Sequence, residues 1–311
     1  MTSMKATSSI NLSVVVPVYN RHDIVMPTLH SIASQDGEMF HLIVVDNGST
    51  DGSFNLLQRE LPKLANDNVK VTLLQEPHPG ACYARNTGLA AADTPWTMFF
   101  DSDDIMLPGH IHRFMDAARS NPEADAIGAP VSLHDGQRAL RTLPFGNNMA
   151  THLMHSCWAT QRYMARTALF RRVGAWNEAL TGWDDYELGV RMLLESPKVV
   201  VIDGTPLVNQ LQHAESITGL DFSHNPQKWE ASLNAIARLL KGRDEMKYVA
   251  ARNAMLAAHY MREGHQSQSA PRYRLALDQC SGRYQRQIIR LIYHTVCATG
   301  HGGPFISLHL L

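Results

Sequence analysis

Four short apolar runs alternate with helix-like segments along the first hundred residues, and this alternation constrains the fold more than any other feature. The runs are residues 14–20, 42–46, 69–74 and 97–100. Runs of this length with few polar interruptions are typical of strands buried on both faces. The segments between them, residues 26–34, 54–64 and 80–92, have the spacing or the alanine content of helices. Strands separated by helices predict an α/β fold with an open, mainly parallel sheet flanked by helices.

Polar residues follow three of these runs, at the point where each strand is expected to end. Tyr19 and Asn20 end the first run, Asp46 ends the second, and the sequence Asp101-Ser102-Asp103-Asp104 follows the fourth. Ligands of parallel sheets bind beyond the carboxyl ends of the strands. Because residues i and i+2 of a strand point to the same side, we expect Asp101 and Asp103 to face one site.

The acidic sequence has two interpretations. Carboxylate oxygens are the ligands that a hard divalent cation such as Mg²⁺ or Mn²⁺ prefers. The same residues could instead form a plain acidic turn, with Asp104 capping the next helix. The position at the end of a strand, next to two other polar strand ends, favours the metal site.

The composition is that of a globular protein from a reducing compartment. Apolar residues make up 44% of the 311 residues and charged residues 18%. No apolar run approaches the roughly 18 residues that a membrane-spanning helix needs, and residues 1–12 lack the apolar core of a secretory signal. The four cysteines have no CxxC spacing, so we expect neither a zinc site nor disulfides. We predict a cytoplasmic location and no nucleic-acid partner.

Four motifs resemble those of the inverting family 2 glycosyltransferases with the GT-A fold. They are VVVPVYN at 14–20, VVDNGSTD at 44–51, ARNTG at 84–88 with FDSDD at 100–104, and GWDDYEL at 182–188 with Arg191 behind it. The resemblance covers about residues 11–220. It implies a GT-A catalytic domain over 1–223, with a nucleotide-binding half at about 11–105 and an acceptor half at about 106–223. A helical C-terminal extension would follow over 224–311.

The resemblance assigns the nucleotide-binding side to residues at the strand ends. Pro17 and Tyr19 would line the nucleotide pocket, where the aromatic ring can stack on a base. Asp46 would accept a hydrogen bond from the base, and Arg85 would contact the base or a phosphate. Asp101 and Ser102 would lie near the nucleotide as well. The alternatives are a turn cap for Asp46 and a surface ion pair for Arg85.

The resemblance also assigns the metal and the catalytic base. Asp103 and His213 would ligate Mn²⁺ or Mg²⁺ at the diphosphate. Asp185 would be the base that takes the proton of the acceptor hydroxyl. Trp183 and Asp184 would contact the acceptor. The alternatives are a helix cap for Asp184, a buried core position for Trp183, and a chance match for His213.

Several other segments receive structural predictions only. We expect a helix at 110–119, a strand at 126–133, loops that face the substrate at 134–160, and a strand at 199–202. Further helices are expected from Gly182 to Leu194 and at 229–240, 245–262 and 283–297. The pairs His110/His112 and His152/His155 have spacings compatible with a shared site, but we interpret them as surface or loop residues.

The C-terminal region differs in charge from the rest. Residues 1–223 hold 16 Lys and Arg against 24 Asp and Glu, whereas residues 224–311 hold 12 against 5. Arg283, Arg286 and Arg290 recur at helical spacing beside isoleucines. Such a basic amphipathic helix could contact the inner face of an anionic membrane. It could equally pack on the protein or on a second copy, with its basic face in solvent.

The function that these patterns predict is a metal-dependent, inverting transfer of a sugar from a nucleotide donor. The donor is predicted to be a UDP-sugar, and the acceptor a hydroxyl of a glycan or lipid-linked molecule in bacterial-type surface polysaccharide synthesis. One alternative is a sugar nucleotidyltransferase, which would need a glycine-rich loop after the first strand. Another is a non-catalytic carbohydrate-binding or scaffold protein that retains the fold.

Overall fold

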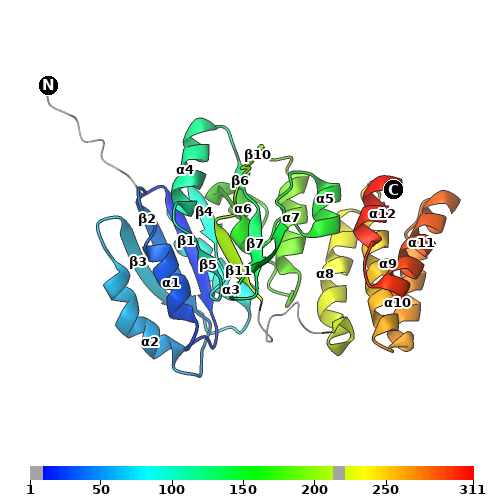
Figure 1. Ribbon diagram of the computed structural model, residues 1–311, viewed down its shortest axis with the longest axis horizontal. Coiled ribbons are helices and arrows are strands. Elements are labelled where there is room, and N and C mark those ends of the chain that lie inside the picture. Colours follow the sequence, from blue (N-terminus) through cyan, green and yellow to red (C-terminus); the bar gives the residue numbers. More distant parts are fainter. Residues whose placement is uncertain (1–9, 213–220) are drawn as a thin grey trace. The chain divides into compact units, whose positions relative to one another are not determined.

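The structure is a computed structural model that describes residues 10–212 and 221–311, and the chain forms two compact units (Figure 1). The first unit contains residues 10–145, 160–178 and 197–212. The second contains residues 146–159, 179–196 and 221–311. This grouping does not test the predicted domain division at residue 223, which stays a prediction.

A seven-stranded sheet forms the centre of the first unit, with the strand order β10-β6-β9-β4-β1-β2-β3. Strands β4, β1, β2 and β3 run parallel, and β9 is antiparallel to both β4 and β6. The mainly parallel α/β sheet predicted from the sequence is therefore confirmed. The strands are β1 (Leu12–Val18), β2 (Phe40–Asp46), β3 (Val69–Gln75), β4 (Trp96–Phe99), β6 (Ala126–Gly128), β9 (Tyr163–Arg166) and β10 (Val199–Val201).

Helices cover both faces of β1 and β2, which explains why these strands are apolar along their whole length. Helices α1 (Val25–Ala33) and α4 (His110–Ser120) share one hydrophobic core with Val14 and Val16 of β1. Helix α3 (Ala81–Ala91) lies on the neighbouring side chains Val15 and Val45. A Cβ at Gly88 would lie 2.3 Å from Val15, so only glycine permits this close approach. The remaining helical segments of this unit are α2 (Ser53–Glu60), η1 (Leu61–Leu64), η2 (Thr160–Arg162) and α6 (Thr167–Arg172).

A second, four-stranded sheet of the first unit begins directly after the acidic sequence. Its order is β5-β11-β7-β8, with β5 (Ile105–Met106), β11 (Val208–Leu211), β7 (Val131–His134) and β8 (Ala139–Leu143). The prediction of loops over 134–160 is wrong in two places, because β8 and helix α5 (Met149–His155) lie there. Most side chains of β8 are exposed, so its sequence lacks the apolar alternation that identifies a strand.

The second unit is helical and is built around α9 (Met246–Arg262). Five buried alanines of α9 let the neighbouring helices approach closely. The other helical segments are α5, α7 (Asp184–Leu194), η4 (Phe222–His224), α8 (Pro226–Leu239), α10 (Gln266–Asp278), α11 (Arg283–Thr299) and α12 (Gly303–Leu310). Among the helices of the described residues, none has both the length and the apolar character needed to cross a membrane.

The helices predicted at 229–240, 245–262 and 283–297 are confirmed as α8, α9 and α11, whereas α10 and α12 were missed. Helix α10 contains Pro271 in its interior and begins with polar residues, both of which weaken the helical pattern. Helix α12 is only eight residues long, and three glycines lie just before it or at its first position.

His110 is buried at the start of α4, which corrects the prediction of a surface residue. In the described structure neither ring nitrogen has a hydrogen-bond partner, and the ring packs on Phe114. Burial, helped by the nearby charge of Arg113, lowers the pKa of His110 to about 3. His152 is also buried, with its Nε2 within 2.9 Å of the carbonyl oxygen of Tyr186.

We predict that His110 makes the fold sensitive to acid. Below about pH 6.5 the unfolded chain binds a proton at this residue, whereas the folded chain does not until about pH 3. The free energy of unfolding therefore falls as the pH falls through this window. The substitution His110→Leu removes this linkage. The difference in the free energy of unfolding between the variant and the wild type should therefore shift in favour of the variant by up to about 1.4 kcal/mol for each pH unit that the pH falls. Urea denaturation of both proteins across the window measures this; parallel curves would contradict the prediction.

Candidate active site

Three strand ends meet at one edge of the large sheet. The register of the parallel strands pairs Val18 of β1 with Asp46 of β2, and Val15 of β1 with Phe99 of β4. The residues that follow these strands therefore leave the sheet at the same edge. This edge carries Tyr19, Asp46 and the acidic turn, the name used below for residues 101–104. The convergence expected from the sequence is confirmed.

Pro17 lies in β1 at this edge, where it removes no hydrogen bond from the sheet. The carbonyl oxygen of Val15 accepts the N–H of Phe100, so residue 15 directs its backbone groups toward β4. Residue 17 faces the same way, because the pattern repeats every second residue. Strand β4 has already ended there, so the missing N–H of proline leaves no carbonyl of the ladder without a donor.

The loops after β1 and β2 are tied to each other by hydrogen bonds. The backbone N–H of Asn20 donates to Ser49 Oγ (3.0 Å), and the N–H of Thr50 donates to Asn20 Oδ1 (2.8 Å). The N–H of Arg21 donates to Ser53 Oγ (2.9 Å). Asn20 has a φ of 51°, a left-handed conformation that asparagine tolerates better than most residues. These bonds fix the positions of both loops at the edge of the sheet.

Asp46 and Tyr19 offer unused binding groups at this edge. The Asp46 side chain is 1% exposed, and its Oδ2 accepts the N–H of Ser49 at 3.2 Å. Its Oδ1 is buried and has no partner in the described structure. A buried acceptor without a donor is costly, so a ligand N–H that reaches it would be favoured. The ring of Tyr19, which follows the paired residue Val18, is 55% exposed and free to stack on a planar ligand.

Asn47 joins the end of β2 to the segment before α3. Its side-chain amide donates to the carbonyl oxygens of Glu76 (3.0 Å) and His78 (2.7 Å), and its Oδ1 accepts the N–H of Gly80 (2.7 Å). These three bonds place the N-terminus of α3, and with it Arg85, at the edge of the sheet. In the sequence, Asn47 is recognisable only as part of a turn motif.

The acidic turn lies beyond the sheet and is not part of a strand. Strand β4 ends at Phe99, so strand alternation does not set the directions of Asp101 and Asp103, contrary to the prediction from the sequence. Both carboxylates nevertheless lie near cationic groups. Arg85 pairs with Asp101, with 3.1 Å between Nη2 and Oδ1. Arg21 lies near Asp103, with 3.8 Å between Nη2 and Oδ2. Arg21 was not predicted, although its position directly after the first strand motif was a signal for it.

Arg85 is held from two sides. Its guanidinium lies 4.4 Å from the ring centre of Trp176, in a cation–π contact, in addition to its ion pair with Asp101. Trp176 in turn packs edge-on against Phe99 at the end of β4. The predicted role of Arg85 in binding a base or phosphate stays a prediction. Trp176 was not predicted, because nothing in the sequence near residue 176 connects it with the acidic turn.

Asp104 and Ser102 anchor the acidic turn to its surroundings. The Asp104 side chain is 2% exposed; its carboxylate accepts the N–H of Leu211 in β11 (2.8 Å) and is hydrogen-bonded to the Gln161 side chain. The carbonyl oxygen of Ser102 accepts the hydroxyl of Thr28 at 3.0 Å. Burial raises the pKa of Asp104 well above its usual value, and the charges of Asp101 and Asp103 add to the rise.

The residues of the acidic turn fit a divalent cation. Asp101 and Asp103 are partly exposed and provide the carboxylate oxygens that Mg²⁺ and Mn²⁺ prefer. The guanidinium of Arg21 next to Asp103 shows that this carboxylate already stabilises a positive group. The other predicted ligand, His213, lies outside the described residues.

The residues predicted for the acceptor side belong to the second unit, at the start of α7. Trp183 precedes the helix with a φ of 50°, a left-handed conformation that is unfavourable for a tryptophan. Its ring packs against Tyr186, Phe222 and Trp229, and Arg252 lies over it at 5.0 Å. Trp183 thus takes part in an aromatic cluster but is only partly buried, so its contact with the acceptor stays a prediction.

Asp184 and Asp185 are the first two residues of α7 and are both partly exposed. Asp185 Oδ1 accepts the N–H of Tyr186 at 2.7 Å. The ammonium of Lys228 lies near Asp184; burial lowers the pKa of Lys228, and the negative charge of Asp184 opposes this shift. The first turn of the helix therefore favours these carboxylates through its dipole and, at Asp184, through a neighbouring cation.

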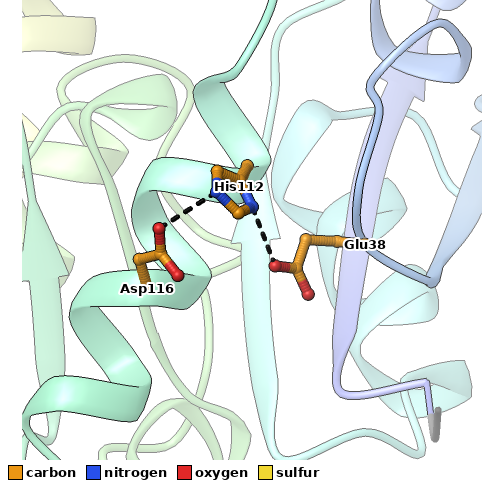
Figure 2. A group of neighbouring side chains, drawn as sticks. All are labelled: Glu38, His112 and Asp116. Atoms are coloured by element: carbon orange, nitrogen blue, oxygen red, sulfur yellow. Dashed lines mark hydrogen bonds and ion pairs between the residues drawn. The ribbon is translucent and has the colours of Figure 1, made fainter.

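A second group of possible metal ligands, Glu38, His112 and Asp116, lies between α4 and the start of β2 (Figure 2). Nδ1 of His112 faces Glu38 and Nε2 faces Asp116, each at 3.1 Å. Opposite sides of one imidazole cannot ligate the same ion. Arg119 also pairs with both carboxylates. We therefore interpret the group as an ion-pair cluster that joins α4 to the loop before β2.

Comparison with known proteins explains the arrangement of the sheet edge. The family model described as glycosyl transferase family 2 matches residues 13–172, which include β1, β2, β4 and the acidic turn. The match covers more than half of the chain. The chain belongs to glycosyl transferase family 2.

Relatives within the family match only part of the chain. The succinoglycan biosynthesis protein ExoW of Rhizobium meliloti is 35% identical over 119 residues, which are 37% of this chain and 35% of ExoW. The poly(ribitol-phosphate) beta-N-acetylglucosaminyltransferase TarS of Staphylococcus aureus is 35% identical over 96 residues, 30% of this chain and 16% of TarS. The chain thus spans about a third of ExoW and a sixth of TarS.

Solved structures confirm the GT-A fold, and their alignments extend over almost the whole chain. Residues 1–349 of S. aureus TarS, in complex with UDP-GlcNAc, align with a TM-score of 0.69 at 17% identity, covering 94% of this chain and 91% of that one. A mannosyltransferase from Pyrobaculum calidifontis, in complex with GDP-Man and Mn²⁺, aligns with a TM-score of 0.59 at 16% identity and covers 96% and 86%. The C-terminal helices are therefore included in the TarS alignment.

We predict that Asn47 stabilises the edge of the sheet. The substitution Asn47→Ala leaves two carbonyl oxygens and one N–H without their partner, and should lower the free energy of unfolding by about 1–3 kcal/mol. The exposed residue Asn68 is a matched control, because Asn68→Ala should change it by less than about 0.5 kcal/mol. Urea denaturation monitored by circular dichroism measures both; equal stabilities of the two variants would disprove the role of Asn47.

Proposed function

We propose that this protein is an inverting glycosyltransferase that moves one sugar from a nucleotide donor to a hydroxyl of a glycan or lipid-linked acceptor. The observation that carries the proposal is the buried, unpartnered Oδ1 of Asp46, together with the exposed ring of Tyr19 at the same edge of the sheet. An N–H of a nucleotide base would supply the missing donor while the base stacks on the ring. The names of ExoW and TarS support a role in surface polysaccharide synthesis.

The donor that we propose is a UDP-sugar. Uracil has one ring N–H next to two carbonyls, and Asp46 together with a nearby arginine would match this pattern. The TarS structure with UDP-GlcNAc supports UDP, whereas the mannosyltransferase with GDP-Man keeps GDP as the alternative. Pro17 and Ser102 would complete the nucleotide pocket, with Asp101 near the ribose.

The diphosphate of the donor would lie at the acidic turn. Asp103, with His213, would hold Mn²⁺ or Mg²⁺, which when bound neutralises charge on the departing nucleoside diphosphate. Arg21 and Arg85 lie beside the acidic turn and form ion pairs with its carboxylates. When the donor binds, their guanidinium groups can pair with its phosphate oxygens instead. Before the donor binds, the two arginines would neutralise part of the negative charge of the acidic turn.

Asp185 would act as the base for the acceptor. Its carboxylate would take the proton of the acceptor hydroxyl as that oxygen attacks the anomeric carbon, and the nucleoside diphosphate would leave from the opposite face. Asp184 and Trp183 would position the acceptor. We propose that this reaction takes place in the cytoplasm, at the inner face of the membrane, where lipid-linked acceptors are found. Self-association of the chain is a separate proposal.

The function is tested by a screen of nucleotide sugars. The purified chain is incubated with UDP-, GDP- and dTDP-sugars, with and without Mn²⁺, and release of the nucleoside diphosphate is measured. We expect release from a UDP-sugar that depends on the metal. The substitution Asp103→Ala should lower the affinity for UDP in the presence of Mn²⁺ to the level seen without the metal. Absence of binding and turnover for every donor would overturn the proposal.

The base is tested by a substitution that keeps shape and removes charge. Asp185→Asn should lower kcat for transfer by about 10²- to 10⁴-fold, the range typical of a general base, with the affinity for UDP and Mn²⁺ unchanged. The matched control Asp184→Asn should raise KM for the acceptor and leave kcat within about tenfold. If Asp185→Asn retains most of its kcat, the assignment of the base is wrong.

A further inference from the structure

The apolar side of helix α11 is buried within the helical unit. Ile288, Ile289, Ile292 and Val296 belong to its hydrophobic core, where they pack with residues of α9. This excludes the simplest form of the membrane hypothesis from sequence analysis, in which the isoleucines would enter the bilayer. The packing alternative is confirmed for this side of the helix.

The opposite side of α11 is exposed and has a distinct composition. We call it the α11 outer face and define it as Arg283, Tyr284, Arg286, Gln287, Arg290, Leu291 and His294. At 3.6 residues per turn these positions occupy one continuous side of the helix, about 17 Å long. The arginines lie along one margin of this side, and the two larger apolar groups lie along the other. Tyr284 is 69% exposed and Leu291 is 48% exposed.

The outer face carries positive charge that nearby residues do not neutralise. The sequence from Gln279 to the last residue contains no aspartate or glutamate. In the described residues 221–311, none of the three arginines of the outer face forms an ion pair with a carboxylate. The nearest acidic residue along the chain is Asp278, five positions before Arg283. A surface of this kind attracts anions and repels cations.

We propose that the α11 outer face binds the surface of a bilayer that contains anionic lipid. Arginines pair with lipid phosphates, while tyrosine and leucine enter the boundary between headgroups and acyl chains. The apolar side chains favour a bilayer over a soluble polyanion as the partner, because contact with an exposed leucine would add nothing to the affinity of a soluble polyanion. Four of the nine large apolar residues that are exposed in the described structure, Tyr284, Leu291, Phe305 and Leu310, fall within the last 28 residues.

The proposal predicts a moderate, salt-sensitive affinity. Each arginine near an anionic surface contributes about fivefold to the binding constant, so three together contribute roughly a hundredfold. Binding of this strength is reversible. Binding of the α11 outer face to the bilayer would hold the protein close to a lipid-linked acceptor. The inference does not depend on the identity of the donor, since lipid binding is measured without any sugar transfer.

Co-sedimentation of the full chain with vesicles tests the proposal. We expect binding to phosphatidylcholine vesicles that contain phosphatidylserine, weaker binding at high salt, and little binding to pure phosphatidylcholine. The triple variant Arg283→Gln, Arg286→Gln and Arg290→Gln should lose roughly a hundredfold in affinity. The matched control is Arg238→Gln, Lys241→Gln and Arg243→Gln, which removes three exposed charges elsewhere in the same unit and should bind like the wild type.

A second variant separates lipid from other polyanions. Tyr284→Ser with Leu291→Ser should weaken binding to the anionic vesicles at least severalfold, while binding to soluble polyphosphate stays unchanged. Circular dichroism should show the same thermal unfolding for all variants, because every substituted side chain is exposed. The proposal is overturned if the wild type ignores anionic vesicles, or if both arginine triples weaken binding equally. It is also overturned if the Tyr284 and Leu291 substitutions have no effect, which would indicate a soluble polyanion as the partner.

Discussion

The close approach of helix α3 to strands β1 and β2 determines the geometry of the candidate active site. Gly88 permits this approach, because any side chain there would overlap Val15. Arg85 lies three residues earlier on the same helix and reaches Asp101 from it. The hydrogen bonds of Asn47 hold the beginning of the helix to the end of β2. The packing of Gly88 on Val15 in the core thus determines the position of the Arg85 guanidinium at the edge of the sheet.

Three acidic side chains within four residues repel one another, and the fold accommodates each of them differently. Asp101 has the guanidinium of Arg85, Asp103 has that of Arg21, and Asp104 is buried against the backbone of β11. Such an arrangement holds the carboxylates in place before any ligand binds, so little reorganisation is needed when one arrives.

The sequence allowed most of the sheet and its polar edge to be predicted, because unbroken apolar runs and terminal aspartates are local patterns. Contacts between distant segments could not be predicted in this way. Trp176 reaches Arg85 from a position ninety-one residues further along the chain, and Asp104 meets the backbone of Leu211. Strand β8 and helix α10 were missed because exposed positions and an internal proline weaken the periodic signal on which such predictions depend.

The interleaving of the two compact units affects how the chain can fold during synthesis. The first unit is complete only when β11 has been made, since its second sheet needs residues 208–211. Helices α5 and α7 are made earlier, yet the hydrophobic core that contains Leu153 and Val190 is completed only by the helices after residue 225. These apolar side chains therefore stay partly exposed until the C-terminal helices have been synthesised. A protein shortened at residue 223 would keep them exposed permanently, and its failure to stay soluble would say nothing about catalysis.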